Sequence, residues 1–218
     1  MSLNINSDPV HIFGLPKSNF VRTVMLICEQ KGIKYTVGFE VKGKPVEFKS
    51  EAHLKMHPYG KIPILLHNDF ALAETASICR YLDNNFTGTK VQFEQEQKSA
   101  YHDAFCAIAS IDIDKAILRD FLVEFAFPKG ENGTVRMDVV KAGIPNVHNA
   151  LRVIGQELAS NNQVINGEQL SIADALLAPM LHYINTVTRD FKLLSEHTEV
   201  ESYLTKLMTF DSCKKVLL

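Results

Sequence analysis

The residues best suited to chemistry lie in the stretch 57–83, which reads HPYGKIPILLHNDFALAETASICRYLD. Pro63 begins an apolar run that is typical of a buried strand. Because proline has no N–H to give to a sheet, it must lie at the first residue or at an edge of that strand, which leaves the backbone of Ile62 free to bind something else. Glu74 and Thr75 then open a helical pattern, and the free N–H groups of a helix start can bind an anion. A free backbone edge beside a helix start suits the carboxylate end of a peptide-like ligand.

The elements that would position these residues are expected in the order βαβ followed by ββα. The pattern predicts a first strand at 10–13, then a helix that Gly32 closes as a C-terminal glycine. Alternating apolar residues predict a second strand at 34–41, a short helix at best follows at 47–56, and Asn68-Asp69 indicates a tight hairpin. A parallel unit joined to an antiparallel hairpin is the thioredoxin-like arrangement.

This combination of motifs resembles the glutathione-binding half of the cytosolic glutathione S-transferases, in particular the serine-type classes (phi- or theta-like, or bacterial). The family pattern is Pro-Phe/Tyr-Gly-Gln/Lys-Ile/Val-Pro, then Glu-Ser/Thr and an isoleucine three or four residues on. The matching residues here are Pro58-Tyr59-Gly60-Lys61-Ile62-Pro63, Glu74-Thr75 and Ile78. The resemblance implies a cis peptide bond before the second proline of the pattern.

The resemblance also implies a catalytic role for Ser18, which lies four residues before Arg22 in the loop after the first strand. Its hydroxyl would donate a hydrogen bond to the glutathione sulfur. Lowering a thiol pKa of about 8.5 by about two units requires about 2.7 kcal/mol. One hydrogen bond to a charged acceptor supplies about 1.5–3 kcal/mol, and a helix N-terminus about 0.3–1 kcal/mol. A single hydroxyl would therefore be enough, without a metal or a general base. The alternative is that Ser18 only caps the helix, and both roles are compatible.

The remaining glutathione contacts are also implied by the resemblance. The backbone of Ile62 would pair with the cysteinyl part of glutathione, and Glu74 and Thr75 would hold the γ-glutamyl end. The implied glutathione-binding residues are Lys49, Lys61, Ile62, Pro63, Glu74 and Thr75.

The two lysines of this set also have an interpretation without a ligand. Lys49 matches a lysine that some serine-type members aim at the glycyl carboxylate, but the histidine that often precedes it is Phe48 here. Lys61 stands where glutamine is common. A solvated surface charge is an equal alternative for Lys49 and the weaker alternative for Lys61. No role is predicted for His57.

The second part of the chain predicts a helical domain. Polar residues at 87–93 indicate a linker between a thioredoxin-like domain at 9–86 and an all-α helical bundle at 94–218. Long helical patterns run over 95–122 and 137–161.

A capping signal lies inside this helical part. Ser171 and Asp174 form a Ser-x-x-Asp pair ahead of an apolar run. The surrounding segment is similar to the Gly-x-x-Leu-Ser/Thr-x-Ala-Asp segment that nucleates the helical domain of glutathione S-transferases. Its expected role is folding and not catalysis.

Composition and charge exclude several other classes. A formal charge of −2 gives no electrostatic reason to expect nucleic acid or an anionic membrane as partner. The first eight residues lack the features of a signal peptide, and no window is long enough to cross a membrane. The four cysteines are isolated, without the spacing of a zinc site or a disulfide framework. A cytoplasmic protein without a bound metal is therefore expected.

Three functions are compatible with these features. The first is a detoxifying transferase that adds the thiolate of its co-substrate glutathione to an apolar electrophile, bound between the domains near Tyr101, Phe105 and Ile108. An apolar helical stripe of this kind is more often core. The second is a glutathione-dependent isomerase or peroxidase on the same fold, and the third is a non-catalytic binding module. The family resemblance also implies a homodimer.

Overall fold

A computed structural model describes residues 8–218, and within it the chain forms two units. The first unit contains the described residues up to Gln92 together with 211–218, and the second contains 93–210. The absence of a signal peptide was predicted from residues that lie almost wholly outside the described part. No helix among residues 8–218 is long and apolar enough to cross a membrane.

The first unit is built on a four-stranded sheet in the order β2-β1-β5-β6. Strands β1 (Val10–Phe13) and β2 (Tyr35–Gly38) are parallel, whereas β5 (Ile64–His67) is antiparallel to β1, and β6 (Phe70–Ala73) is antiparallel to β5. Asn68 takes a left-handed φ of 56° in the tight turn between β5 and β6. The predicted combination of a parallel unit and a hairpin is confirmed.

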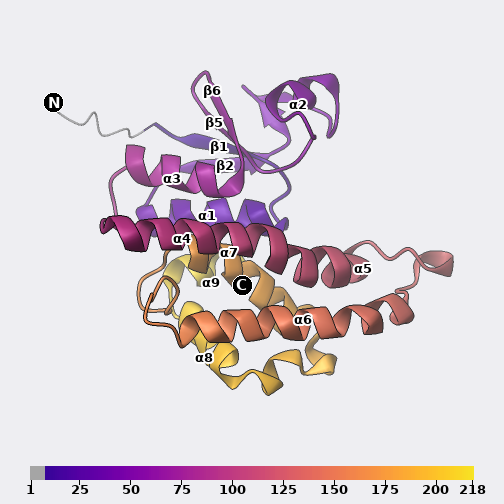
Figure 1. The fold of residues 1–218 in the computed structure, drawn as a ribbon. Coiled ribbons are helices and arrows are strands. Elements are labelled where there is room, and N and C mark those ends of the chain that lie inside the picture. Colours follow the sequence, from indigo (N-terminus) through magenta and orange to yellow (C-terminus); the bar gives the residue numbers. More distant parts are fainter. Residues whose placement is uncertain (1–7) are drawn as a thin grey trace. The chain divides into compact units, whose positions relative to one another are not determined.

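Helices α1 (Asn19–Lys31) and α3 (Thr75–Asn85) lie together on one side of this sheet, and the short α2 (Glu51–Met56) lies away from them (Figure 1). Gly32 ends α1 with a left-handed φ of 69°, as the sequence predicts. The C-terminal helix α9 (Asp211–Leu217) packs on α1 and therefore belongs to the first unit.

The second strand is shorter than the sequence predicts. A continuous strand at 34–41 was expected, but β2 stops before Phe39, whose ring packs edge-on against Phe13 with centroids 5.3 Å apart. The chain then continues as a separate hairpin of β3 (Glu40–Val41) and β4 (Lys44–Pro45). The packing of the Phe39 ring thus ends β2 within a stretch whose alternating apolar residues predict one continuous strand.

The second unit is helical, and its first helical stretch is longer than expected. The predicted helix at 95–122 begins as α4 (Glu96–Ile108) and continues without a break through the π-helical segments η1 (Ala109–Ile113) and η2 (Lys115–Leu122) into α5 (Val123–Ala126). The π-helical turns were not foreseen, because their wider hydrogen-bond spacing leaves no mark in an apolar pattern.

The other helices of this unit are α6 (Met137–Leu158), α7 (Ile172–Val187) and α8 (Thr198–Leu207). Short 3₁₀ turns occur as η3 (Glu131–Gly133), η4 (Arg189–Phe191) and η5 (Leu193–Glu196).

The predicted capping pair begins α7. The Ser171 hydroxyl accepts the N–H of Asp174 at 3.1 Å, and the Asp174 carboxylate accepts the N–H of Ser171 at 2.8 Å. The hydroxyl of Tyr203 also donates to Asp174, at 2.5 Å. Burial raises the pKa of the Asp174 carboxyl to about 6. The capping prediction is confirmed.

Candidate functional site

Ser18 occupies the N-cap position of α1 but does not use its side chain as a cap. Its backbone is extended, with φ −71° and ψ 136°, and its carbonyl accepts the N–H of Arg22 at 2.9 Å. The side chain makes no capping hydrogen bond, and the residue is partly exposed. The hydroxyl therefore stays available at a helix N-terminus, where the N–H groups of the first turn favour a negative charge.

The segment at Ile62 lies close to the first turn of α1. A Cβ added to Gly14, at the end of β1, would lie 2.6 Å from Val21 Cγ2 and 3.3 Å from Ile62 Cβ. The Ile62–Pro63 peptide bond is cis, as the resemblance implies. Among residues 8–218, no protein group pairs with the backbone N–H or C=O of Ile62. Gly14 therefore lies between Val21 of α1 and Ile62, which brings the free backbone groups of Ile62 into the neighbourhood of the helix that begins at Ser18.

Glu74 has an unusual backbone at the start of α3. Its φ of 71° lies in a region that few residues other than glycine adopt, and such residues concentrate at binding sites. Its exposed carboxylate lies 3.6 Å from Nε2 of His57. Thr75 follows as the first helical residue, and within the described chain no protein group binds its hydroxyl. The first turn of α3 therefore offers N–H groups and a hydroxyl to a ligand.

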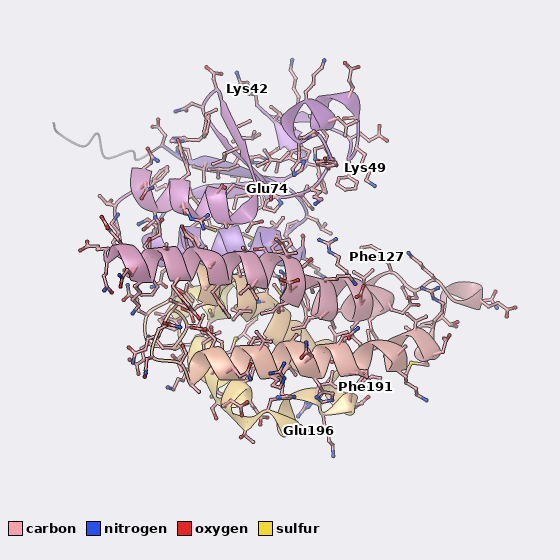
Figure 2. All side chains as sticks on the ribbon, viewed as in Figure 1. Lys42, Lys49, Glu74, Phe127, Phe191 and Glu196 are labelled. Carbon is pink, nitrogen blue, oxygen red and sulfur yellow. The ribbon has the colours of Figure 1, made fainter. Side chains whose placement is uncertain are left out.

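Lys49 and Lys61 present two exposed ammonium groups in the same unit. Nζ of Lys49 lies 5.6 Å from the ring centroid of Phe48, and Nζ of Lys61 lies 5.9 Å from that of Tyr59. In the part of the chain that the structure describes, neither ammonium has an acidic partner. Figure 2 labels Lys49 beside α2 and Glu74 where β6 passes into α3.

Three residues near these candidates carry no signal in the sequence. His57, 4% exposed, accepts the Tyr59 N–H through Nδ1 at 3.2 Å and faces Glu74 through Nε2. His53 is fully buried and contacts the backbone of both lysines. Asn19, next to Ser18, is 8% exposed, and within residues 8–218 its two amide atoms have no hydrogen-bond partner. What the three residues share is burial, which tertiary packing decides and residue spacing does not reveal.

The residues predicted for a second substrate lie on α4. Tyr101 and Ile108 are 44% and 38% exposed, whereas Phe105 is 3% exposed. The hydroxyl of Tyr101 lies 3.5 Å from Oε2 of Glu157. A cavity of about 380 Å³ in the second unit is lined by residues of η2, α5 and α6 and contains none of the three. Their role in substrate binding stays a prediction.

The described residues contain neither a cluster of metal ligands nor an exposed cysteine. Residues 8–218 contain no group of three or more His, Cys, Asp and Glu side chains that could hold a metal ion. All four cysteines are buried, and burial raises the pKa of the Cys28 thiol, which disfavours the reactive thiolate.

Two domain families match the sequence. "Glutathione S-transferase, N-terminal domain" matches residues 12–90, and "Glutathione S-transferase, C-terminal domain" matches residues 137–206. Together the two matches cover more than half of the chain.

Two curated relatives represent different functions. The chain is 26% identical over 211 residues to the probable glutathione S-transferase GSTF1 of Oryza sativa subsp. japonica, with 95% of each chain covered. It is also 26% identical over 215 residues to elongation factor 1-gamma of Prunus avium, covering 94% of this chain and 46% of that protein. It therefore spans just under half the length of the elongation factor.

A solved structure shows the same fold. Glutathione S-transferase I from maize, in complex with an atrazine glutathione conjugate, superposes with a TM-score of 0.77 at 22% identity, covering 96% of this chain and 97% of that chain. At this identity the similarity concerns the fold alone. The predicted fold class, a thioredoxin-like domain followed by a helical domain, is confirmed.

Proposed function

The chain belongs to the glutathione S-transferase family, and we propose that it uses glutathione as co-substrate and activates its thiol through the hydroxyl of Ser18. The observation that carries this proposal is the Ser18 hydroxyl at the start of α1, which makes no capping hydrogen bond, with the unpaired backbone of Ile62 across Gly14 from the same turn. One group would stabilise the thiolate while the other would align the cysteinyl backbone.

The chemistry requires only a shift in the thiol equilibrium. The glutathione S–H loses its proton to solvent, and the Ser18 O–H donates a hydrogen bond to the resulting S⁻. A hydrogen bond to a charged acceptor contributes about 1.5–3 kcal/mol, close to the roughly 2.7 kcal/mol that a drop of about two pKa units requires. The thiolate then forms an S–C bond with the electrophile, and the electron pair moves to the leaving group or to the acceptor atom of an addition.

The rest of the glutathione molecule has a proposed partner at each charged end. The first turn of α3, with Glu74 and Thr75, would hold the γ-glutamyl group. Ile62 would pair with the cysteinyl backbone next to Pro63. The unpaired ammonium groups of Lys49 and Lys61 would face the glycyl carboxylate, because a carboxylate is the partner that both lack within the described chain.

The second substrate is proposed to be an apolar electrophile. The maize structure holds a glutathione conjugate of atrazine, which supports this substrate class. Tyr101, Phe105 and Ile108 remain the proposed contacts. A cytoplasmic homodimer with a detoxifying role is the corresponding biological proposal.

A second candidate function follows from the similarity to elongation factor 1-gamma. In this alternative the chain is a non-catalytic binding module, and Ser18 serves only to start α1. The two candidates differ in whether the bound glutathione thiol has a lowered pKa.

The deciding experiment is a pH titration of the thiolate absorbance of glutathione bound to the wild type, Ser18→Ala and Ser18→Thr. A transferase should show a depressed thiol pKa in the wild type. Ser18→Ala should bind glutathione but lose the shift, and Ser18→Thr should keep part of it because it retains a hydroxyl. Binding without a shift in any of the three proteins would refute the serine mechanism and favour the binding module.

A further inference from the structure

We propose that His53 is a positioning residue that holds Lys49 and Lys61 in place and thereby sets a preference for ligands with a glycyl carboxylate. This inference rests on the proposed glutathione site. It goes beyond that site because His53 itself lies buried beneath the two lysines and offers no free atom to a ligand.

Both ring nitrogens of His53 are used by the two lysine-bearing segments. Nδ1 accepts the backbone N–H of Lys49 at 2.9 Å, and Nε2 lies 3.1 Å from the carbonyl oxygen of Lys61. A carbonyl only accepts, so the proton must be on Nε2, and the neutral ring then donates on one side and accepts on the other. His53 is therefore a bridge between two backbone segments that are twelve residues apart.

The surroundings of His53 fix its position. His53 is 0% exposed, and its ring packs against Phe13 and Phe48 with centroid distances of 4.9 and 5.2 Å. The backbone N–H of His53 also donates to Oγ of Ser50 at 3.4 Å, at the start of α2. Since the ring has no freedom to follow a displaced lysine, it defines where the lysine backbones lie.

The backbone of Lys49 depends on such a support. Its φ of 64° lies in the left-handed region, which residues with a Cβ seldom adopt. The chain at Gly60 comes close to it, because a Cβ added to Gly60 would lie 3.3 Å from Lys49 Cγ. The hydrogen bond to His53 thus holds a strained residue next to the segment that carries Lys61.

This arrangement matters for an anionic ligand. Both ammonium groups lack an acidic partner within residues 8–218, and both are exposed, so a carboxylate bound there would gain from both charges only if the two segments keep their spacing. The discriminating ligand pair is glutathione and its glycyl amide, which differ only in that carboxylate. Losing a charged hydrogen bond corresponds to about a tenfold or greater loss of affinity.

The test compares the dissociation constants of glutathione and glutathione glycyl amide by calorimetry. The wild type should prefer glutathione by about tenfold or more. His53→Phe keeps an aromatic ring but removes both hydrogen bonds, so this preference should fall toward one while binding of the amide changes little. In a Lys49→Ala/Lys61→Ala background, His53→Phe should have no further effect on the preference.

His67→Phe is the matched control, because His67 is a buried histidine of the same unit that contacts Tyr81 and neither lysine. It should leave the preference unchanged. If His53→Phe does not fold, His53→Gln, which keeps a donor and an acceptor, replaces it and should retain part of the preference.

An unchanged preference in His53→Phe, or an equal loss of affinity for both ligands, would overturn the positioning role while leaving the proposed function intact. Equal binding of both ligands by the wild type would show that the lysines do not bind the glycyl carboxylate, which would also overturn the positioning role of His53. A wild type that binds neither would refute the proposed function, and the role of His53 with it.

Discussion

Lys31 in α1 and Asp83 in α3 form an ion pair in which both side chains are 0% exposed, with Nζ and Oδ1 2.8 Å apart. The pair also holds the segment after α3. Lys31 donates to the carbonyl of Thr89 at 3.3 Å, and Asp83 accepts the N–H of Val91 at 3.3 Å and the side-chain amide of Gln92 at 3.0 Å. Replacing Lys31 by methionine keeps most of its volume but removes the buried cation of Asp83, whose remaining cation is the half-exposed Lys90, with Nζ 4.0 Å from Oδ2.

The expected loss of stability follows from the burial of the Lys31–Asp83 pair. Removing one partner of a buried pair typically costs about 3–5 kcal/mol, because the remaining charge has lost its water and its buried counter-ion, and the longer, solvent-screened contact of Asp83 with Lys90 offsets little of this loss. For a chain of this size about 1 kcal/mol lowers the melting temperature by about 2–4 °C, so Lys31→Met should melt about 6–20 °C below the wild type. The Thr89 carbonyl also loses its donor, so the neighbouring segment should open more often.

Two assays read this change. Thermal unfolding followed by circular dichroism measures the loss of global stability. Limited trypsin cleavage after Lys90 measures the opening of the segment after α3, and trypsin can reach this site because the Lys90 side chain is 56% exposed. Lys42→Met is the matched control, since the Lys42–Asp69 pair is 72% and 91% exposed. Its removal should leave the melting temperature nearly unchanged, because water screens an exposed ion pair.

The double variant Lys31→Met/Asp83→Leu separates charge from packing. It should recover part of the loss, although the N–H of Val91 then lacks its acceptor. If Lys31→Met is no less stable than Lys42→Met and Lys90 is cleaved at the wild-type rate, the buried pair does not hold this segment and the reasoning fails.

Two further predictions concern the second unit. Hydrogen bonds from Arg136 lower the pKa of the Glu124 carboxyl from 4.5 to about 2. The ionised carboxylate therefore stabilises the fold above about pH 4.5, and this contribution should fade as the pH drops toward 2. Acid unfolding should show this loss of stability in the wild type and much less of it in Arg136→Met. Identical dependence of stability on pH in the two proteins would contradict the prediction. Ser171→Ala should lower the free energy of unfolding by about 0.5–2 kcal/mol in urea titrations, because α7 loses its cap. Glutathione affinity should be unchanged in Ser171→Ala. A loss of glutathione affinity without a loss of stability would contradict this prediction.

The features that the sequence could predict are local ones. Gly32 at the end of α1, the Asn68 turn and the Ser171–Asp174 cap each depend on residues within a few positions of one another. The cis bond before Pro63 was available only through the family resemblance, since many prolines begin strands with a trans bond.

The features that the sequence could not predict depend on distant contacts. Lys31 and Asp83 are 52 positions apart, and nothing in either neighbourhood distinguishes them from surface charges. His53 reads as an ordinary polar residue of a short helix, yet it is fully buried between Phe13 and Phe48. Tertiary packing decides these roles, so composition and periodicity carry no information about them.

The serines at helix starts show how structure separates residues that sequence treats alike. Ser18, Ser50 and Ser171 all occupy N-cap positions, and serine at such a position is expected to cap. Ser50 accepts the N–H of His53 and Ser171 accepts the N–H of Asp174, but Ser18 makes no such bond. A serine that starts a helix without capping it keeps its hydroxyl for another acceptor or donor. That difference supports Ser18 as the thiol-activating residue, and it is why Ser18→Ala should alter the thiol pKa while Ser171→Ala should alter stability.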